Sequence, residues 1–154
     1  MPRNPMKIGL IIAGGVLGLL TLLYVVRFVA LHYVSKSSES VVSDHYKPDE
    51  IVRKDLVANG RGLLSKGVAV KGNGALVLTK KELGWFQIAP SSEVIIPLSK
   101  ITSVDIVHEH NGYSGRPLLQ VHFTTEGGGS DAWAWYVQDQ DDWKRDIDKA
   151  RSGS

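Results

Sequence analysis

The sequence contains no cysteine among its 154 residues, and it has only two methionines and three phenylalanines. Without cysteine, the chain has no disulfide framework, no thiolate metal ligand and no thiol nucleophile. The compartment stays open, because a cysteine-free chain fits either side of a membrane. Charge is also scarce near the N-terminus, where one long stretch of sequence is entirely apolar.

This apolar run extends from Ile8 to Val26 and is bounded by Lys7 and Arg27. Nineteen residues at 1.5 Å each give a helix of about 28 Å, close to the thickness of the hydrocarbon core of a bilayer. A signal peptide has a shorter apolar region that ends at a small-x-small cleavage site. A buried core helix would leave only a small domain to cover it. The run therefore predicts a retained, single-pass transmembrane helix within residues 1–34.

The ends of the predicted helix carry equal charge, so they predict no orientation. Two basic residues precede the run and two follow it closely, which leaves the side of the folded domain undecided. Gly14 and Gly18 stand four residues apart and share one helix face. This spacing lets a second helix approach closely, so we expect another transmembrane helix to pack here. That helix belongs either to a partner protein or to a second copy of this chain in a helix-mediated oligomer.

Behind the helix, residues 35–48 are interpreted as a short polar linker, 49–151 as one domain and 152–154 as a tail. About 120 residues suffice for one compact core. From Ser35 onward, 15 Lys and Arg stand against 16 Asp and Glu, so the domain is nearly neutral and no nucleic-acid partner is expected. The segment from Arg53 to Glu82 nevertheless holds seven basic and two acidic residues. This asymmetry favours an anionic membrane surface, with an ordinary mixed surface as the alternative.

The domain is predicted to be mainly β, with one C-terminal helix. Short apolar runs separated by Gly, Pro, Asn and Ser are typical of antiparallel strands. We predict strands at Ala75–Thr79, Leu83–Gln87, Glu93–Pro97, Ile101–His110, Leu118–Thr125 and Ala132–Val137. A helix follows, with Asp139 as N-cap and with Trp143, Ile147 and Ala150 on its buried stripe. Trp133 and Trp135 share a strand face and are expected in the core beneath that helix.

Three segments of the domain resemble a known family. They are Asn59-Gly-Arg-Gly62, Gly74-Ala-Leu-Val-Leu-Thr-Lys-Lys-Glu-Leu83 and Ile96-Pro-Leu-Ser-Lys-Ile-Thr-Ser-Val104. Together with a Trp-bearing C-terminal helix, they resemble the GRAM group of pleckstrin-homology-like (PH-like) domains. The resemblance implies a seven-stranded, two-sheet, partly closed barrel capped by one helix. It also implies binding of lipid headgroups or proteins rather than catalysis.

The candidate binding residues are basic and aromatic. We expect Arg61, Lys66, Lys71, Lys80 and Lys81 to form one basic rim for anionic lipid. Trp85 and Phe86 point to opposite faces of a strand, so one of them is expected at the surface as a contact for lipid or a partner.

Catalytic and metal-binding patterns are weak. His108, His110 and His122 invite comparison with a zinc site. Matching the apolar faces of their two strands, however, pairs Val104, Ile106 and His108 with Phe123, Val121 and Leu119, which puts His122 on the opposite face, near Asp105. A one-residue slip in that register would bring the three together. Lys71-Gly-Asn-Gly74 is interpreted as a hairpin turn rather than a phosphate loop. We therefore predict no enzyme, no cofactor and no metal.

Two functions remain open from the sequence. One is a membrane-anchored GRAM/PH-like module that binds partner proteins or anionic lipid headgroups. The other is an accessory or scaffold subunit of a larger membrane complex, in which the transmembrane helix packs against other subunits.

Overall fold

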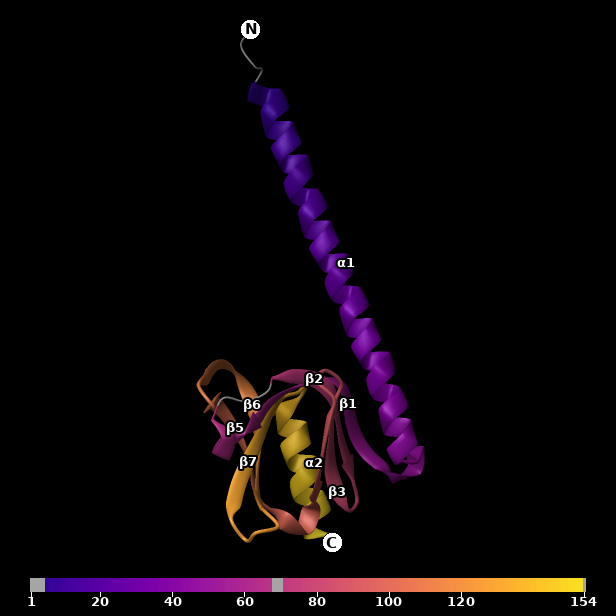
Figure 1. Cartoon of the computed structure of the whole chain (residues 1–154), viewed down its shortest axis with the longest axis vertical. Coiled ribbons are helices and arrows are strands. Elements are labelled where there is room, and N and C mark those ends of the chain that lie inside the picture. The colour runs from indigo at the N-terminus through magenta and orange to yellow at the C-terminus, as the bar shows by residue number, and fades with distance from the viewer. Residues whose placement is uncertain (1–4, 68–70, 154) are drawn as a thin grey trace. The chain divides into compact units, whose positions relative to one another are not determined.

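The structure, a computed structural model, describes the backbone of residues 5–67 and 71–153 and the side chains of residues 15–67 and 71–153 (Figure 1). Its helices and strands are α1 (Pro5–His45), β1 (Ile51–Leu63), β2 (Gly72–Thr79), β3 (Glu82–Gln87), β4 (Ser92–Pro97), β5 (Ile101–His110), β6 (Tyr113–Thr124), β7 (Ser130–Tyr136) and α2 (Gln140–Ser152). The chain divides into two compact units, Met1–Tyr33 and Val34–Ser154. We call the second unit the folded domain.

The described part of the first unit belongs to α1, and its described side chains are exposed and mostly apolar. Leu17 is 67% exposed, Leu22 59% and Phe28 64%. The stretch Gly15–His45 is long and apolar enough to cross a membrane. The prediction of a long apolar helix is therefore confirmed.

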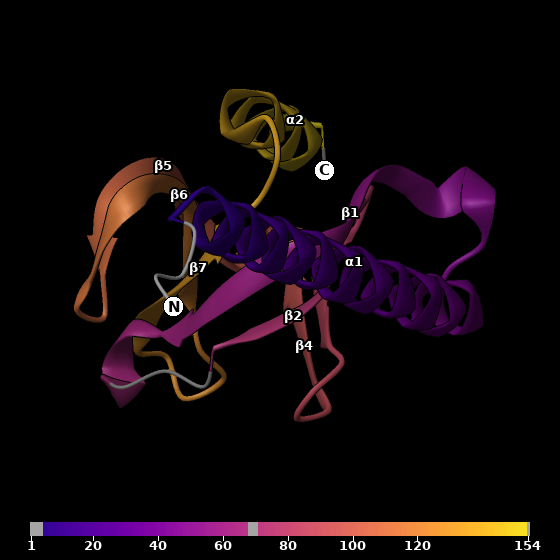
Figure 2. The ribbon, with the colours of Figure 1, turned by 90° about the horizontal axis from the view of Figure 1, so that it is seen from above.

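The folded domain is built on seven antiparallel strands in the order β4-β3-β2-β1-β7-β6-β5. The 13-residue strand β1 belongs to both halves of this sheet, because it pairs with β2 from Ile51 to Gly60 and with β7 from Asn59 to Leu63. Irregularities in both ladders let the strand bend, so the sheet curls into a partly closed barrel. Figure 2 shows α2 on the open side of this curl. The predicted fold class, mainly β with one C-terminal helix and PH-like, is confirmed.

The main core fills the inside of the curled sheet beneath α2. It contains Trp133, Trp135 and Trp143, as expected, together with aliphatic side chains from β2, β3, β5 and β6. Ile147 is fully buried, and Ala150 packs against the same cluster. The predicted apolar stripe of the helix therefore faces the core.

The start of α2 differs from the prediction in its chemistry. Asp139 occupies the N-cap position, but its side chain makes no capping hydrogen bond. An N-cap side chain acts from an extended backbone, whereas the φ of Asp139 is +54°, in the left-handed region.

A second apolar cluster lies on the outer face of the sheet, and it overturns the predicted linker. Val42 is 2% exposed and packs with Ala75, Val77 and Phe86, and Ser38 is also buried. The segment 34–45 is helical and belongs to the folded domain, so the polar spacer expected at 35–48 is wrong for these residues. The serines of this segment suggested a polar spacer, but the segment is a helix with one narrow face buried.

The predicted turn at Lys71-Gly-Asn-Gly74 is also wrong, because β2 begins at Gly72. Asn73 pairs with Asn59 across the ladder, and their side-chain amides form a hydrogen bond of 2.6 Å. A Cβ on Gly74 would overlap the backbone of β3. Here glycine serves close packing between strands rather than a change of direction.

The β5–β6 hairpin has the predicted faces in a shifted register. We expected Val104, Ile106 and His108 to lie opposite Phe123, Val121 and Leu119. In the structure Val104 pairs with Val121 and Ile106 with Leu119, a shift of two residues. Because side chains alternate with a period of two, an even shift keeps the residues from Ser103 to Val107, where the pairing is regular, on their predicted faces. His122 accordingly lies 4.0 Å from Asp105, as predicted.

Candidate functional site

The five predicted cationic residues lie in two groups at opposite ends of β2. Arg61, Lys66 and Lys71 surround the connection between β1 and β2, and we call them the β1–β2 basic group. Lys80 and Lys81 form the two-residue turn between β2 and β3. An eight-residue strand spans about 25 Å, so the expected single rim is wrong.

All five cations nevertheless share one property. Within the described residues, none of them has a carboxylate within ion-pair distance. Three of the four basic residues of α2 behave differently, since Lys144, Arg145 and Arg151 each pair with an aspartate of the same helix. The five predicted cations therefore keep a free positive charge, unlike these three residues of α2.

In the β1–β2 basic group, Arg61 is held and the two lysines are exposed. The Arg61 guanidinium lies over the Tyr113 ring, 4.2 Å from its centroid. Its Nε is buried and has no hydrogen-bond partner among the described residues. A guanidinium stacked in this way keeps its charge and loses little further freedom when it meets an anion.

The tip of the β5–β6 hairpin secures the end of β1 beside this group. Asn111 has a φ of +49° and Gly112 of +71°, the pattern of a tight Asn-Gly turn. The Asn111 amide donates to the carbonyl of Leu63 at 2.8 Å. His110 Nε2 lies 2.9 Å from the carbonyl oxygen of Gly62. The tip is thus tied to the strand that carries Arg61.

A chain of polar side chains continues from His110 along β6. His110 is 3% exposed, and its Nδ1 lies 2.8 Å from the Gln120 amide nitrogen. The Gln120 carbonyl oxygen lies 2.9 Å from Nε2 of His122. The backbone carbonyl of Gly62 can only accept a hydrogen bond, so His110 donates to it from Nε2–H. A bulge after Val107 brings His110 and His122 to the same amide, which the predicted alternation did not foresee.

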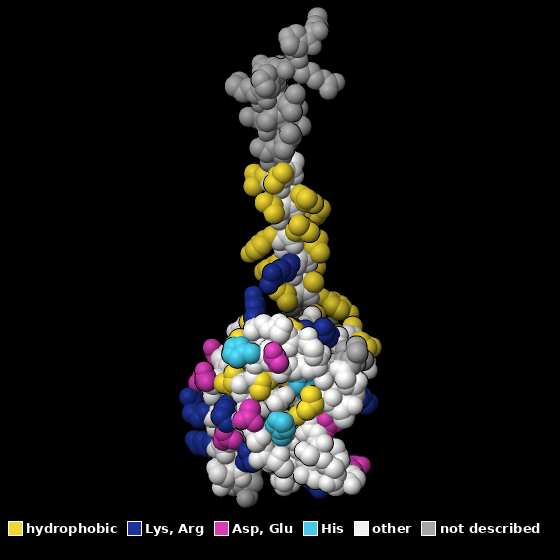
Figure 3. Space-filling view, turned by 90° about the vertical axis from the view of Figure 1, so that its left-hand side faces the viewer, with side chains coloured by type: hydrophobic (Ala, Val, Ile, Leu, Met, Phe, Trp, Pro, Cys, Tyr) yellow, Lys and Arg dark blue, Asp and Glu magenta, His cyan; other side chains and the backbone are white. Residues whose placement is uncertain are grey.

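This arrangement does not gather the histidines around one point. His108 is exposed and bonds to the carbonyl of Gly115 at 3.3 Å. Within residues 15–67 and 71–153, no group of three or more His, Asp or Glu side chains is placed to hold a metal ion. Figure 3 shows histidine, acidic and basic side chains interspersed on the face that it presents.

The start of the β1–β2 connection is pinned to β7. Asp131 accepts hydrogen bonds from the Ser65 hydroxyl at 2.6 Å and from the Ser65 backbone N–H at 3.1 Å. Partial burial works in the opposite direction, but these bonds and one from Ala132 prevail and lower the pKa of Asp131. The connection that carries Lys66 therefore starts from a fixed point.

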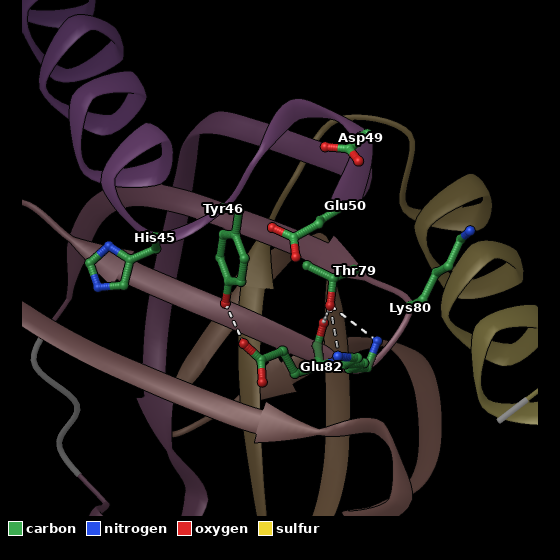
Figure 4. A pocket seen from close by; sticks show the side chains of 8 residues that line it. His45, Tyr46, Asp49, Glu50, Thr79, Lys80 and Glu82 are labelled. Atoms are coloured by element: carbon green, nitrogen blue, oxygen red, sulfur yellow. Dashed lines mark hydrogen bonds between the residues drawn. The ribbon is translucent and has the colours of Figure 1, made fainter.

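At the other end of β2, a pocket of about 430 Å³ lies beside the Lys80-Lys81 turn (Figure 4). Its lining is mostly acidic and aromatic: His45, Tyr46, Asp49, Glu50, Thr79, Lys80, Lys81 and Glu82. Three carboxylates face two lysines, so this pocket does not suit an anionic headgroup. Figure 4 shows Lys80 directed away from the other labelled side chains, toward α2.

Two local interactions build this end of the domain. Thr79 Oγ1 accepts hydrogen bonds from the N–H groups of Lys81 and Glu82, both at 3.1 Å, which fixes the turn. The Tyr46 hydroxyl donates to Glu82 at 2.8 Å. Burial, followed by this bond to a carboxylate, raises the pKa of the Tyr46 phenol.

Trp85 and Phe86 lie on opposite faces of β3, as predicted, but the expectation that one of them lies at the surface is wrong. Trp85 is 1% exposed and lies in the main core, and Phe86 is 2% exposed and lies in the outer cluster under α1. Val42, His45 and Tyr46 cover Phe86, with ring centroids 4.6 Å from His45 and 5.9 Å from Tyr46. Neither residue is available as a contact in this conformation.

The helix-packing residues are only partly described. Gly14 lies in α1, outside the residues whose side-chain surroundings the structure describes. Gly18 has no atom within 4 Å of the position that a Cβ would take. Helix packing through these two glycines stays a prediction.

No protein-family model and no curated protein matches this chain. Among solved structures, a chain of "The 8S snRNP Assembly Intermediate" is similar with a TM-score of 0.56 and 12% identity, over 70% of this chain and 88% of that one. The PDZ-RhoGEF DH/PH domains in complex with activated RhoA are similar with a TM-score of 0.48 and 11% identity, over 68% of this chain and 30% of that one. The Slm1 PH domain in complex with inositol 4-phosphate is similar with a TM-score of 0.43 and 17% identity, over 68% of this chain and 95% of that one.

At these identities the likeness concerns the fold alone. The strand order and the C-terminal helix agree with the architecture expected from the sequence. The folded domain has a pleckstrin-homology-like fold.

Proposed function

We propose that the chain is a single-pass, membrane-anchored interaction module of the GRAM group, without catalytic activity, that binds anionic lipid headgroups at the membrane surface. The observation that carries this proposal is the course of α1. An exposed apolar helix continues, without a spacer, into turns that are buried on a PH-like sheet. Exposed apolar surface of this extent calls for lipid or another apolar helix.

The free cations favour lipid as the ligand of the folded domain. The β1–β2 basic group contains three positive charges, none paired with a carboxylate in the described part of the chain. A basic residue near an anionic leaflet contributes about 1 kcal/mol, so three contribute about 3 kcal/mol. This attraction weakens as salt screens it.

The test uses the full-length chain in lipid nanodiscs. All four tryptophans lie in the folded domain and serve as donors for energy transfer to a dansyl-labelled lipid headgroup. We expect greater transfer in discs that contain phosphatidylserine than in discs of phosphatidylcholine alone. The difference should disappear in high salt and in the triple variant Arg61→Gln, Lys66→Gln, Lys71→Gln.

A charge-matched variant separates this site from net charge. Lys47, Lys100 and Arg145 are exposed and lie outside the β1–β2 basic group. Changing these three to Gln should preserve the response to phosphatidylserine. Equal transfer on both lipids, or equal losses in the two triple variants, would refute lipid binding by this group.

An accessory subunit of a membrane complex is the second candidate, favoured by the open face at Gly18. A small residue with free space beside it lets a partner helix approach closely. The expected result is co-purification of the wild-type chain with a partner at fixed stoichiometry in mild detergent, lost in Gly18→Leu. A wild-type chain that purifies alone from its native membrane contradicts this function.

A further inference from the structure

A second concave surface lies between α2 and the sheet, away from the β1–β2 basic group. It is a groove of about 530 Å³, lined by Val52, Lys80, Asp146, Lys149, Ala150 and Gly153, and we call it the α2 groove. Its volume lies within the range of small-molecule sites. Three elements form it: the start of β1, the β2–β3 turn and the last turns of α2.

The free charge of the α2 groove is positive. Lys80 and Lys149 are both exposed, and neither side-chain ammonium group has a hydrogen bond or an ion pair with any other described residue. The carboxylate in the groove is already neutralised, because Asp146 lies 2.6 Å from Nε of Arg53. Two uncompensated ammonium groups therefore face one cavity.

The two amines come from fixed positions. Lys80 belongs to the turn that Thr79 closes, and its side chain is directed toward α2 (Figure 4). Lys149 lies on a helix anchored in the core by Trp143 and Ile147. Arg151, on the same last turn, is engaged with the Thr102 carbonyl at 2.9 Å. Lys149 is thus the cation that this end of α2 leaves for a ligand.

The rest of the groove wall is apolar and open. Val52 is 47% exposed although it is a large aliphatic residue, and Ala150 lies on the helix side of the groove. A ligand that suits this wall carries a short carbon skeleton beside its charged group.

We propose that the α2 groove binds a phosphate monoester, with the phosphate between the ammonium groups of Lys80 and Lys149 and its carbon skeleton against Val52. A phosphate monoester carries a charge of about −1.5 to −2 at neutral pH, which matches two lysines better than a single carboxylate does. Lysine binds phosphate as a point charge, without the geometry that a bidentate arginine demands. The ester belongs either to a lipid headgroup or to a free phosphate compound.

The test titrates the isotope-labelled full-length chain in detergent micelles and follows the amide resonances of Val52, Lys80 and Ala150 by NMR. The probes are dioctanoyl phosphatidic acid, glycerol 3-phosphate and inorganic phosphate, with dioctanoyl phosphatidylcholine as the control. We expect saturable shifts with the phosphate monoesters and none with phosphatidylcholine. Affinity at least tenfold higher for phosphatidic acid identifies a lipid source, and equal affinity for glycerol 3-phosphate identifies a free compound.

Two double variants decide whether the lysines form the site. Each charge-assisted contact is worth about tenfold in affinity, so Lys80→Gln with Lys149→Gln should weaken binding roughly a hundredfold. Lys47→Gln with Lys100→Gln makes the same charge change elsewhere and should leave binding within threefold. All four positions are exposed, so both variants are expected to fold.

The proposal is overturned if no phosphate probe produces saturable shifts, or if both double variants bind alike. It does not depend on the β1–β2 basic group, whose triple variant should bind the probes normally. Loss of energy transfer in nanodiscs and loss of these resonance shifts therefore report on separate surfaces.

Discussion

Replacing Val42 by alanine tests whether the end of α1 is part of the folded domain. Val42 is 2% exposed and packs on Ala75, Val77 and Phe86. The change removes two methyl groups, each worth about 0.8 kcal/mol. The residual cavity adds to this loss, so we expect a decrease of roughly 2–3 kcal/mol in the free energy of unfolding.

The sign of the effect separates packing from helix propensity. On a solvent-exposed helix, valine to alanine is favourable by up to about 0.7 kcal/mol. An unpacked helical spacer therefore predicts no loss or a small gain, opposite to the effect expected from burial. The exposed neighbour Ser40 provides the matched control, and Ser40→Ala should change stability by less than about 0.5 kcal/mol.

The assay is urea unfolding of the full-length chain in mild detergent, followed by tryptophan emission. All four tryptophans lie beyond α1, so the signal reports on the folded domain. The midpoint should fall without a change in slope, since a lower midpoint at constant slope means lower stability. A Val42→Ala variant as stable as Ser40→Ala would refute the packing of α1 on the sheet.

Three further predictions use the same assay. The neutral phenol of Tyr46 is favoured by its raised pKa, so its stabilising contribution is complete below about pH 10 and is lost as pH rises further. The wild-type midpoint should therefore fall more steeply above pH 10 than that of Tyr46→Phe. Gly74→Ala would overlap the backbone of β3 and should abolish the cooperative transition, whereas Gly127→Ala has free space and should not. His110→Ala removes the partner of the Gly62 carbonyl and should cost about 1–3 kcal/mol.

Each of these expectations has a contrary outcome. Parallel pH profiles for wild type and Tyr46→Phe would show that the phenol ionises equally in both states. A cooperative Gly74→Ala variant would mean that β2 and β3 separate at little cost. Near-normal stability of His110→Ala would show that water replaces the histidine at the hairpin tip.

The strands from β2 to β7 were predictable because each is a short apolar run between turn residues. β1 was harder to find, since it contains the Asn59-Gly-Arg-Gly62 segment and pairs with two neighbours through irregular ladders. Its two faces also meet different surroundings: Ala58 belongs to the main core, and Leu56 packs against the outer cluster. A strand that bends between two such environments shows no simple alternation.

The sequence indicated the cations of the candidate site but not their arrangement. Lysine and arginine identify free charge, but only the pairing of Gly60 with Gly72 and of Ile51 with Thr79 shows which end of β2 each cation occupies. Likewise, the burial of Phe86 depends on turns of α1 whose serines predict a polar spacer. The periodicity of apolar residues in a strand does not show which distant segment packs on each face of that strand.

The double role of β1 also imposes an order on folding. Strands β1 to β4 and the segment 34–45 are complete once Pro97 has been made, and they hold the outer cluster among themselves. The other edge of β1 has to wait for β7, because Gly60 pairs with Trp135, which lies 75 positions later in the chain. Contacts between residues so far apart in the chain form slowly, since the entropy of closing a long loop is lost before the contacts stabilise the fold. During synthesis, the two halves of the sheet can therefore join at β1 only after β7 has been made.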